Sequence, residues 1–230
     1  MHYVNLPDTH QHPLTFYLAM EEYLAENKSG EYFFLWRVPP TVIYGHNQDV
    51  EAEVNLDYCR QHGIRVCQRK SGGGCVYADM GNVMLSYIVR DTNVKRIFAD
   101  YLNRLATALQ SLGYPAVTTE HNDVMIEGHK VSGNAFYAKP HSSIVHGTLL
   151  YNVDFDAMMH AITPSREKLS SHGVQSVRQR VGNLSNPSNL SNLSTLLSHL
   201  KASFSDGEIT LNTDDITHIH QIEKTYICNT

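Results

Sequence analysis

The chain has 230 residues, of which 42% are hydrophobic, so it is long enough for one large domain with a sizeable core. A formal charge of −5 argues against general nucleic-acid binding. No apolar run approaches the roughly 18 residues that a membrane span needs. The N-terminus has no cationic segment followed by an apolar one, so we expect no secretory signal.

The first half of the chain alternates short strands and helices. Apolar side chains at helical spacing predict a helix that starts near Pro13, and Gly63 is suited to end a second helix. The predicted order is a helix at 13–27, strands at 31–38 and 41–48, a helix at 55–63, and strands at 64–70 and 82–90 on either side of a glycine-rich loop.

The second half opens with an amphipathic helix over 94–113 and continues with several antiparallel strands over 115–154, which turn at Glu127-Gly128. Helices are expected at 154–162, 164–173 and near 191–202, and the tail 203–230 is polar and weakly patterned. This order predicts an α+β fold in which one main, mixed and mostly antiparallel sheet is covered by helices.

The cysteines and histidines suggest no metal or redox motif. Cys59, Cys67, Cys75 and Cys228 have no CxxC spacing, and the 14 histidines are scattered without an HExxH pattern. We therefore expect four reduced thiols in a cytoplasmic protein.

The stretch "RKSGGGCVYADMGN", residues 69–82, places three glycines after two cations and a hydroxyl. Such a backbone can approach a ligand closely, and its N–H groups can point at phosphate or carboxylate oxygens. The alternative is a tight turn between two strands. The stretch matches neither a P-loop nor the dinucleotide fingerprint.

A second stretch, "EHNDVMIEGHKVSGNAFY" at 120–137, has Asp123 on one strand and Lys130 on the next. The hairpin should bring them together, where a carboxylate can hold Mg²⁺ and a lysine can neutralise a phosphate. A surface ion pair is the simpler alternative. Further along, His146 precedes a buried strand, where a histidine is most often a structural hydrogen-bonding group.

These stretches, together with "HGTLLYNVD", "TVIYGHNQD" and "SVRQRVGNLS", resemble the lipoate-protein ligase family over about residues 14–200. The resemblance implies a biotin/lipoyl-ligase fold with a catalytic domain at 1–202 and a short C-terminal tail at 203–230. It implies that lipoate attacks ATP to give lipoyl-adenylate, and that a lysine of a lipoyl carrier domain then takes the lipoyl group. The implied carriers are 2-oxoacid dehydrogenase subunits and the glycine cleavage H protein.

The resemblance also implies roles for individual residues. Lys130 matches the lysine that contacts the adenylate, and Asp123 would help to hold Mg²⁺. The remaining substrate- and nucleotide-binding positions are Arg69, Ser71, Gly72, Gly73, Gly74, Tyr77, Asn82, Asn122, Ser132, Gly133 and His146.

Two alternatives stay open beside the ligase. Related octanoyl and lipoyl transferases pass the acyl group through a cysteine thioester, and Cys75 lies in the glycine-rich loop. A non-catalytic lipoate or carrier binder is the other alternative, because the chain departs from the family pattern at His46, Gln68 and Ala78. Residues 203–230 are also too few for the accessory domain of larger ligases, so a separate accessory subunit is an expectation.

Overall fold

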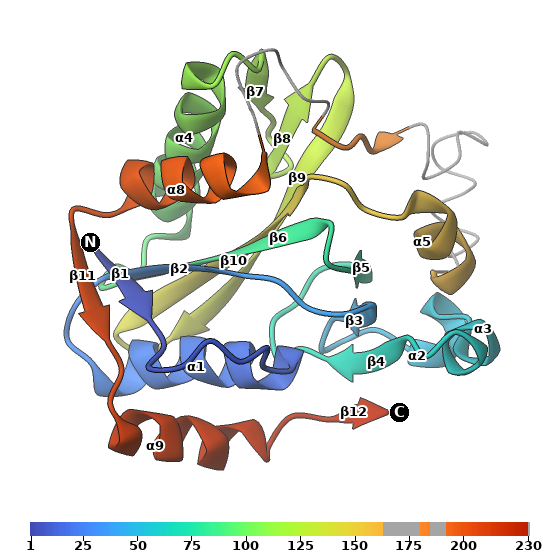
Figure 1. Ribbon diagram of the computed structural model, residues 1–230, viewed down its shortest axis with the longest axis horizontal. Helices are drawn as coiled ribbons and strands as arrows, with labels where there is room; N and C mark the ends of the chain where they lie inside the picture. The colour runs from blue at the N-terminus through green and yellow to red at the C-terminus, as the bar shows by residue number, and fades with distance from the viewer. Residues whose placement is uncertain (163–179, 185–191, 230) are drawn as a thin grey trace.

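The computed structural model describes residues 1–162, 180–184 and 192–229 (Figure 1). The helix expected at 164–173 lies outside them. The strands are β1 (His2–Asn5), β2 (Tyr32–Trp36), β3 (Thr41–Tyr44), β4 (Arg65–Gln68), β5 (Val76–Ala78), β6 (Asn82–Val89), β7 (Ala116–Thr118), β8 (Asp123–Ile126), β9 (His129–Lys139), β10 (Ser142–Leu150), β11 (Gly207–Thr210) and β12 (Cys228–Asn229). The helices are α1 (Leu14–Asn27), α2 (Val50–Glu53), α3 (Leu56–Gln61), α4 (Val94–Ser111), α5 (Phe155–Ala161), α8 (Leu193–Phe204) and α9 (Thr213–Glu223).

The main sheet has eight strands in the order β11-β1-β2-β6-β10-β9-β8-β7. Strand β1 pairs in parallel with both β11 and β2, and the other pairings in this sheet are antiparallel. The prediction of a mixed, mostly antiparallel sheet covered by helices is therefore confirmed. Its central strands β6 and β10 are buried along their whole length.

The prediction of a single main sheet was incomplete, because a second sheet of four strands has the order β12-β4-β3-β5. Helices α2, α3 and α5 pack near it around a small apolar cluster that includes Val42, Tyr44 and Met158. The loop between β4 and β5, residues 69–75, is called the glycine loop below. This second sheet therefore presents the glycine loop to the larger one.

Helices cover both faces of the main sheet (Figure 1). On one face α4 and α8 pack against residues such as Phe33 and Leu85. On the other face α1 lies between the sheet and α9, and almost all of its side chains are buried. Because both sides of α1 are covered, two consecutive glutamates of this helix, Glu21 and Glu22, are buried at 1% and 5% exposure.

Residues 207–229 form a strand, a helix and a short strand that the weak sequence pattern did not predict. Strand β11 pairs with β1, α9 packs along α1, and β12 pairs with β4, so this segment touches both sheets. Asn212 begins α9 with a reciprocal cap in which Asp215 also takes part. The division of the chain at residue 202 stays a prediction.

The expectation of four reduced thiols was wrong for one pair. Cys67 of β4 and Cys228 of β12 form a disulfide, whereas Cys59 and Cys75 are thiols that take part in no disulfide among the described residues. The two cysteines are 161 residues apart, and pairing of the last strand with β4 brings them together. Because the two cysteines are so far apart in the sequence, no spacing motif predicts the disulfide.

Among the described residues, no helix combines the length and the apolar character needed to cross a bilayer.

Candidate functional site

A cavity of about 600 Å³ lies between the two sheets. Its wall includes Gly73 and Gly74 of the glycine loop and Lys130 of β9. The predicted juxtaposition of a cation at 130 with a bare stretch of backbone is therefore present. Five other predicted residues also line this cavity: Arg69, Tyr77, Asp123, Gly133 and His146.

Arg69 organises the glycine loop from within. It is only 5% exposed, and its guanidinium donates to the carbonyl oxygens of Gly72, Gly74 and Ile43 at 2.7–3.1 Å. Burial lowers the pKa of Arg69 to about 10. Arg69 therefore lines the cavity and at the same time holds the loop in shape through these hydrogen bonds, while its role toward a ligand stays a prediction.

The backbone conformation at Gly73 requires a glycine. Its φ is +96°, a conformation that L side chains rarely adopt, and a Cβ there would lie 2.9 Å from the guanidinium of Arg69. A Cβ on Gly72 would meet nothing within 4 Å. Among the described residues, no hydrogen bond uses the N–H groups of Gly72, Gly73 or Gly74. These donors are consequently available to an anionic ligand.

Lys130 and Asp123 meet across the β8–β9 hairpin. The turn at Glu127 and Gly128 has positive φ at both residues, +50° and +82°, which matches the twist of a two-residue hairpin. Asp123 pairs with Gly133, and the lysine side chain crosses that glycine to bring Nζ within 2.8 Å of Asp123 Oδ1. A Cβ at Gly133 would lie 2.7 Å from Lys130 Cε. Because Gly133 has no side chain, the Lys130 side chain can cross it to reach Asp123.

His146 belongs to a buried chain of hydrogen bonds below the glycine loop. Its Nε2 lies 2.7 Å from Ser71 Oγ and its Nδ1 lies 3.0 Å from Glu21 Oε2. Glu21 also accepts from Ser86, which accepts from the indole of Trp36. Ser71 is 2% exposed and does not line the cavity. The chain fixes the start of the glycine loop to α1 and β10, in line with a structural histidine.

The remaining predicted residues stand around the cavity and not on its wall. Asn82 is fully buried, and its Oδ1 has no hydrogen-bond partner among the described residues. The carbonyl of Asn122 accepts from Asn134 Nδ2 at 2.8 Å, and Ser132 is fully buried beside the same asparagine. Asn134 lines the cavity itself, so it is the member of this group that faces a ligand.

Sequence reasoning named no residue of the apolar end of the cavity. This end is lined by Leu14, Leu18, Trp36, Ile43 and Met84, which come from segments predicted only as a helix or a strand. Arg180, in a motif quoted for the resemblance but given no role, also reaches the wall. It does so because the segment around Val181 runs beside Lys130, whose carbonyl accepts from the N–H of Gly182 at 3.0 Å.

The three departures from the family pattern differ in their position. The N–H of His46 donates to the Ser71 carbonyl at 3.0 Å, and Gln68 Nε2 donates to the His46 carbonyl at 3.1 Å. The His46 N–H therefore supports the glycine loop directly, and the Gln68 side chain supports it through the His46 carbonyl. Ala78 is fully buried on β5 and does not line the cavity.

Residues 13–205 match the family model of the lipoyl protein ligase A/B catalytic domain. The chain is 38% identical over 220 residues to lipoate–protein ligase 1 of Staphylococcus aureus, a match that covers 91% of this chain and 66% of the relative. The chain thus spans just under two thirds of that relative's length.

Two solved structures share the fold. The bi-partite lipoate protein ligase of Thermoplasma acidophilum superimposes with a TM-score of 0.84 at 23% identity, over 97% of this chain and 92% of that one. Lipoate-protein ligase A bound with ATP gives 0.81 at 22% identity, over 97% and 94%. The match over residues 13–205 decides the family: the chain belongs to the lipoyl protein ligase A/B catalytic-domain family.

Proposed function

We propose that this protein is a lipoate–protein ligase that activates lipoate with ATP and transfers the lipoyl group to a lysine of a lipoyl carrier domain. One observation carries the proposal: the Lys130 ammonium and the bare backbone of Gly73 and Gly74 line one cavity whose other end is apolar. This arrangement suits a ligand with an anionic head and a hydrocarbon tail.

The apolar end suits the dithiolane and alkyl chain of lipoate. Trp36 and Leu18 belong to its wall, and the buried Trp36 indole donates to Ser86 at 2.9 Å. The tryptophan therefore has its polar group satisfied and offers only apolar surface to the tail. Burial of the tail there favours binding by about 0.8 kcal/mol per methylene.

The polar end suits the two chemical steps. In the first step, a carboxylate oxygen of lipoate attacks the α-phosphorus of ATP, and pyrophosphate leaves. In the second, the carrier lysine attacks the acyl carbon, AMP leaves and the amine loses a proton. In the first step negative charge shifts from the carboxylate to the phosphoryl oxygens and the departing pyrophosphate, and in the second step it builds on the acyl oxygen. Lys130, whose side chain is 39% exposed, and the free N–H groups of the glycine loop would stabilise that charge.

Magnesium in nucleotide sites is held by one or two carboxylates together with phosphate oxygens. Asp123 is such a carboxylate at the polar end of the cavity. Within residues 1–162, 180–184 and 192–229, no group of three or more His, Cys, Asp or Glu side chains gathers to hold a metal. The residues present thus fit an Mg²⁺ ion that arrives with ATP, and Asp123 would be its protein ligand.

The proposed partners are lipoyl domains of 2-oxoacid dehydrogenases and the glycine cleavage H protein, with a cytoplasmic location. Support comes from the Thermoplasma structure, which is described as a bi-partite ligase with its E2 lipoyl domain. A separate accessory subunit is part of the proposal for the same reason.

The test is incubation of the full chain with lipoate, Mg-ATP and an apo lipoyl domain, followed by intact mass of the carrier. A parallel reaction supplies preformed lipoyl-adenylate. Modification in the first reaction supports the ligase, and modification in the second alone supports transfer that depends on an accessory subunit for activation. If neither reaction modifies the carrier, the proposal fails, and calorimetry with lipoate then tests the non-catalytic binder.

A further inference from the structure

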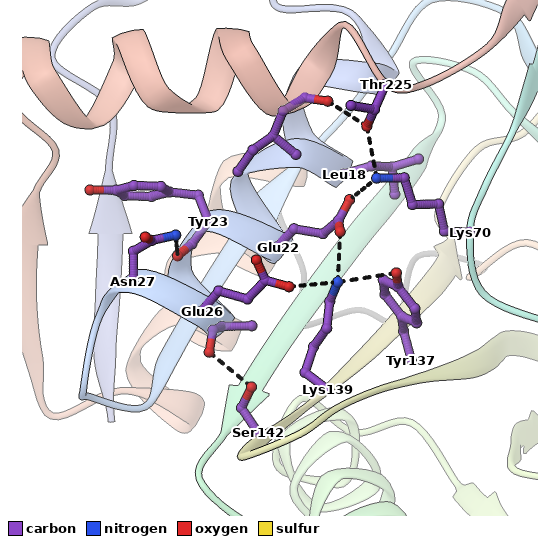
Figure 2. A network of polar contacts seen from close by, with 12 residues as sticks. Leu18, Glu22, Tyr23, Glu26, Asn27, Lys70, Tyr137, Lys139, Ser142 and Thr225 are labelled. Carbon is purple, nitrogen blue, oxygen red and sulfur yellow. Dashed lines mark hydrogen bonds and ion pairs between the residues drawn. The ribbon is translucent and has the colours of Figure 1, made fainter.

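A cluster of charged and phenolic side chains joins Lys70 of the glycine loop to α1 (Figure 2). Glu22 of α1 is its centre. Glu22 Oε1 accepts from Lys70 Nζ at 2.7 Å and from the Tyr226 hydroxyl at 2.6 Å, and Oε2 accepts from Lys139 Nζ at 2.7 Å. The carboxylate thus joins the glycine loop, β9 and the C-terminal segment.

Lys70 is the loop residue that enters this cluster. Its neighbours Arg69 and Ser71 contact the loop carbonyls and His146, whereas Lys70 points toward α1 and α9. Its ammonium also donates to Thr225 Oγ1 at 2.8 Å and lies 4.4 Å from the Tyr226 ring centre. Lys70 is therefore held from several sides.

Charge favours this arrangement. Burial raises the pKa of Glu22, but hydrogen bonds from Lys139, Lys70 and Tyr226 outweigh that effect and keep the pKa below its usual value. An ionised carboxylate that is 5% exposed requires its donors, since a buried charge without partners is costly. Removing any one donor from the cluster should therefore cost free energy.

We propose that Glu22 is a positioning residue, which holds Lys70 and thereby fixes the glycine loop in the shape that presents Gly73 and Gly74 to the cavity. The effect on substrate rests on the proposed function, whereas the effect on the loop does not. Glu22 does not line the cavity, and its link to the glycine loop runs through Lys70.

The experiment compares two variants that each remove one lysine from the same carboxylate. Lys70→Met cuts the link to the glycine loop, and Lys139→Met cuts the link to β9. A third variant, Glu26→Gln, removes a partner of Lys139 on the same helix without touching Lys70. Native-state hydrogen exchange of the free full-length protein reports opening of residues 69–75 without any substrate.

We expect Lys70→Met to speed exchange in the loop about tenfold, the factor for loss of one charge-assisted hydrogen bond. Lys139→Met and Glu26→Gln should leave loop exchange as in the wild type, and Lys70→Arg should restore it. In the lipoylation assay, Lys70→Met should raise the KM for lipoate about fivefold with little change in kcat, because ground-state and transition-state binding weaken together.

Unchanged loop exchange in Lys70→Met overturns the inference, and so does equal acceleration in Lys70→Met and Lys139→Met, which would make Glu22 a general stabiliser. Absence of carrier modification by the wild type is a different result. It would defeat the proposed function, while the exchange data would still decide the role of Glu22.

Discussion

The molecule contains two lysine–carboxylate contacts of nearly equal length in opposite surroundings. Lys130 and Asp123 meet at 2.8 Å with side chains 39% and 20% exposed, on the wall of the cavity. Glu22 meets Lys70 and Lys139 at 2.7 Å each, and its side chain is 7% exposed. Among the described residues, the first carboxylate has one ammonium partner, whereas the second has two together with a phenol.

This difference separates a site from a structural support. The Lys130 ammonium has donors left for a ligand, and its partially exposed pair adds only about 0–1 kcal/mol to folding. The Glu22 cluster is saturated and buried, so its removal leaves charges without partners. Substitutions at the cavity should therefore change activity and spare stability, whereas substitutions at Glu22 should lower stability and should affect activity only through the glycine loop.

The largest effect is expected for Glu22→Ala. It leaves the 11%-exposed side chain of Lys139 with Glu26 as its remaining carboxylate and takes the acceptor from Tyr226. Breaking a buried pair in this way costs about 3–5 kcal/mol of the free energy of unfolding. Urea denaturation at pH 7 measures it, with Glu26→Ala as the matched control. A loss below about 1 kcal/mol, typical of a surface pair, would place Glu22 in the same class as Asp123.

The next effect concerns Lys130→Met, which keeps the length of the side chain and removes its charge. Loss of one electrostatic contact to a developing oxyanion typically lowers kcat about 10²–10³-fold. The melting temperature should stay within a degree or two of the wild type, because a partly exposed pair adds little stability. Carrier lipoylation and thermal unfolding are measured side by side, with the exposed Lys95→Met as control. Full activity in Lys130→Met would remove the lysine from the chemistry.

The same contrast explains what the sequence predicts and what it does not. Lys130, Asp123 and the turn at Glu127-Gly128 are close in the chain, so a hairpin pattern was enough to bring them together. The Glu22 cluster joins residues up to 204 positions apart, and the Cys67–Cys228 bond spans 161. Such pairs depend on how the C-terminal segment packs on α1 and β4, which no local pattern encodes.

The residues that line the apolar end of the cavity were not identified from the sequence for a different reason. Leu18 and Trp36 have the spacing of core residues, and a tunnel wall and a core have the same hydrophobic pattern. The family resemblance pointed to Lys130 and the glycine loop, and both line the cavity. It assigned a ligand role to Arg69, whose donors the structure directs to loop carbonyls.

Gly133→Ala tests the cavity pair with a smaller change. An added Cβ would lie 2.7–2.9 Å from the end of the Lys130 side chain, which is flexible and can move aside. The stability should change little, while the displaced ammonium should lower kcat about tenfold, since misplacing a catalytic group by about an ångström is costly. A matched Gly128→Ala is unsuitable because φ there is +82°, so Ala135→Gly on the same strand serves as the control. An unchanged kcat in Gly133→Ala would mean that catalysis does not depend on the position of the Lys130 ammonium beside Gly133.

Acid should weaken the stabilisation that Glu22 provides. The pKa of Glu22 is lowered in the folded state, so its stabilisation is fully present above the unfolded value near 4.3 and is lost as pH falls through the folded value. The stability gap between the wild type and Glu22→Gln should be constant from pH 7 to 5 and should shrink below about pH 4.3. The other charged and phenolic groups around this carboxylate are Lys70, Lys139, Tyr226 and Glu26. The pKa values of Lys139 and Tyr226 are raised above their usual values, so both keep their protons throughout this pH range. A gap that does not narrow would contradict the assignment of an ionised Glu22.

The smallest effect is expected for Cys75→Ala, which decides between the ligase and a thioester transferase. Cys75 is half-buried on the cavity wall, at the end of the same loop that Arg69 begins. In the ligase the acyl group is activated as a mixed anhydride, so no protein nucleophile is needed, and activity should change less than about twofold, as for a small apolar packing residue. A transferase would lose nearly all activity, because its acyl group is carried on the thiol.

Intact mass of the enzyme after incubation with acyl donor gives a second readout, since a thioester adds the acyl mass to the wild type and not to Cys75→Ala. Retained activity without an adduct would leave Lys130 and the glycine loop as the groups that act on the acyl carbon, whereas an adduct on Cys75 would move the chemistry to the thiol.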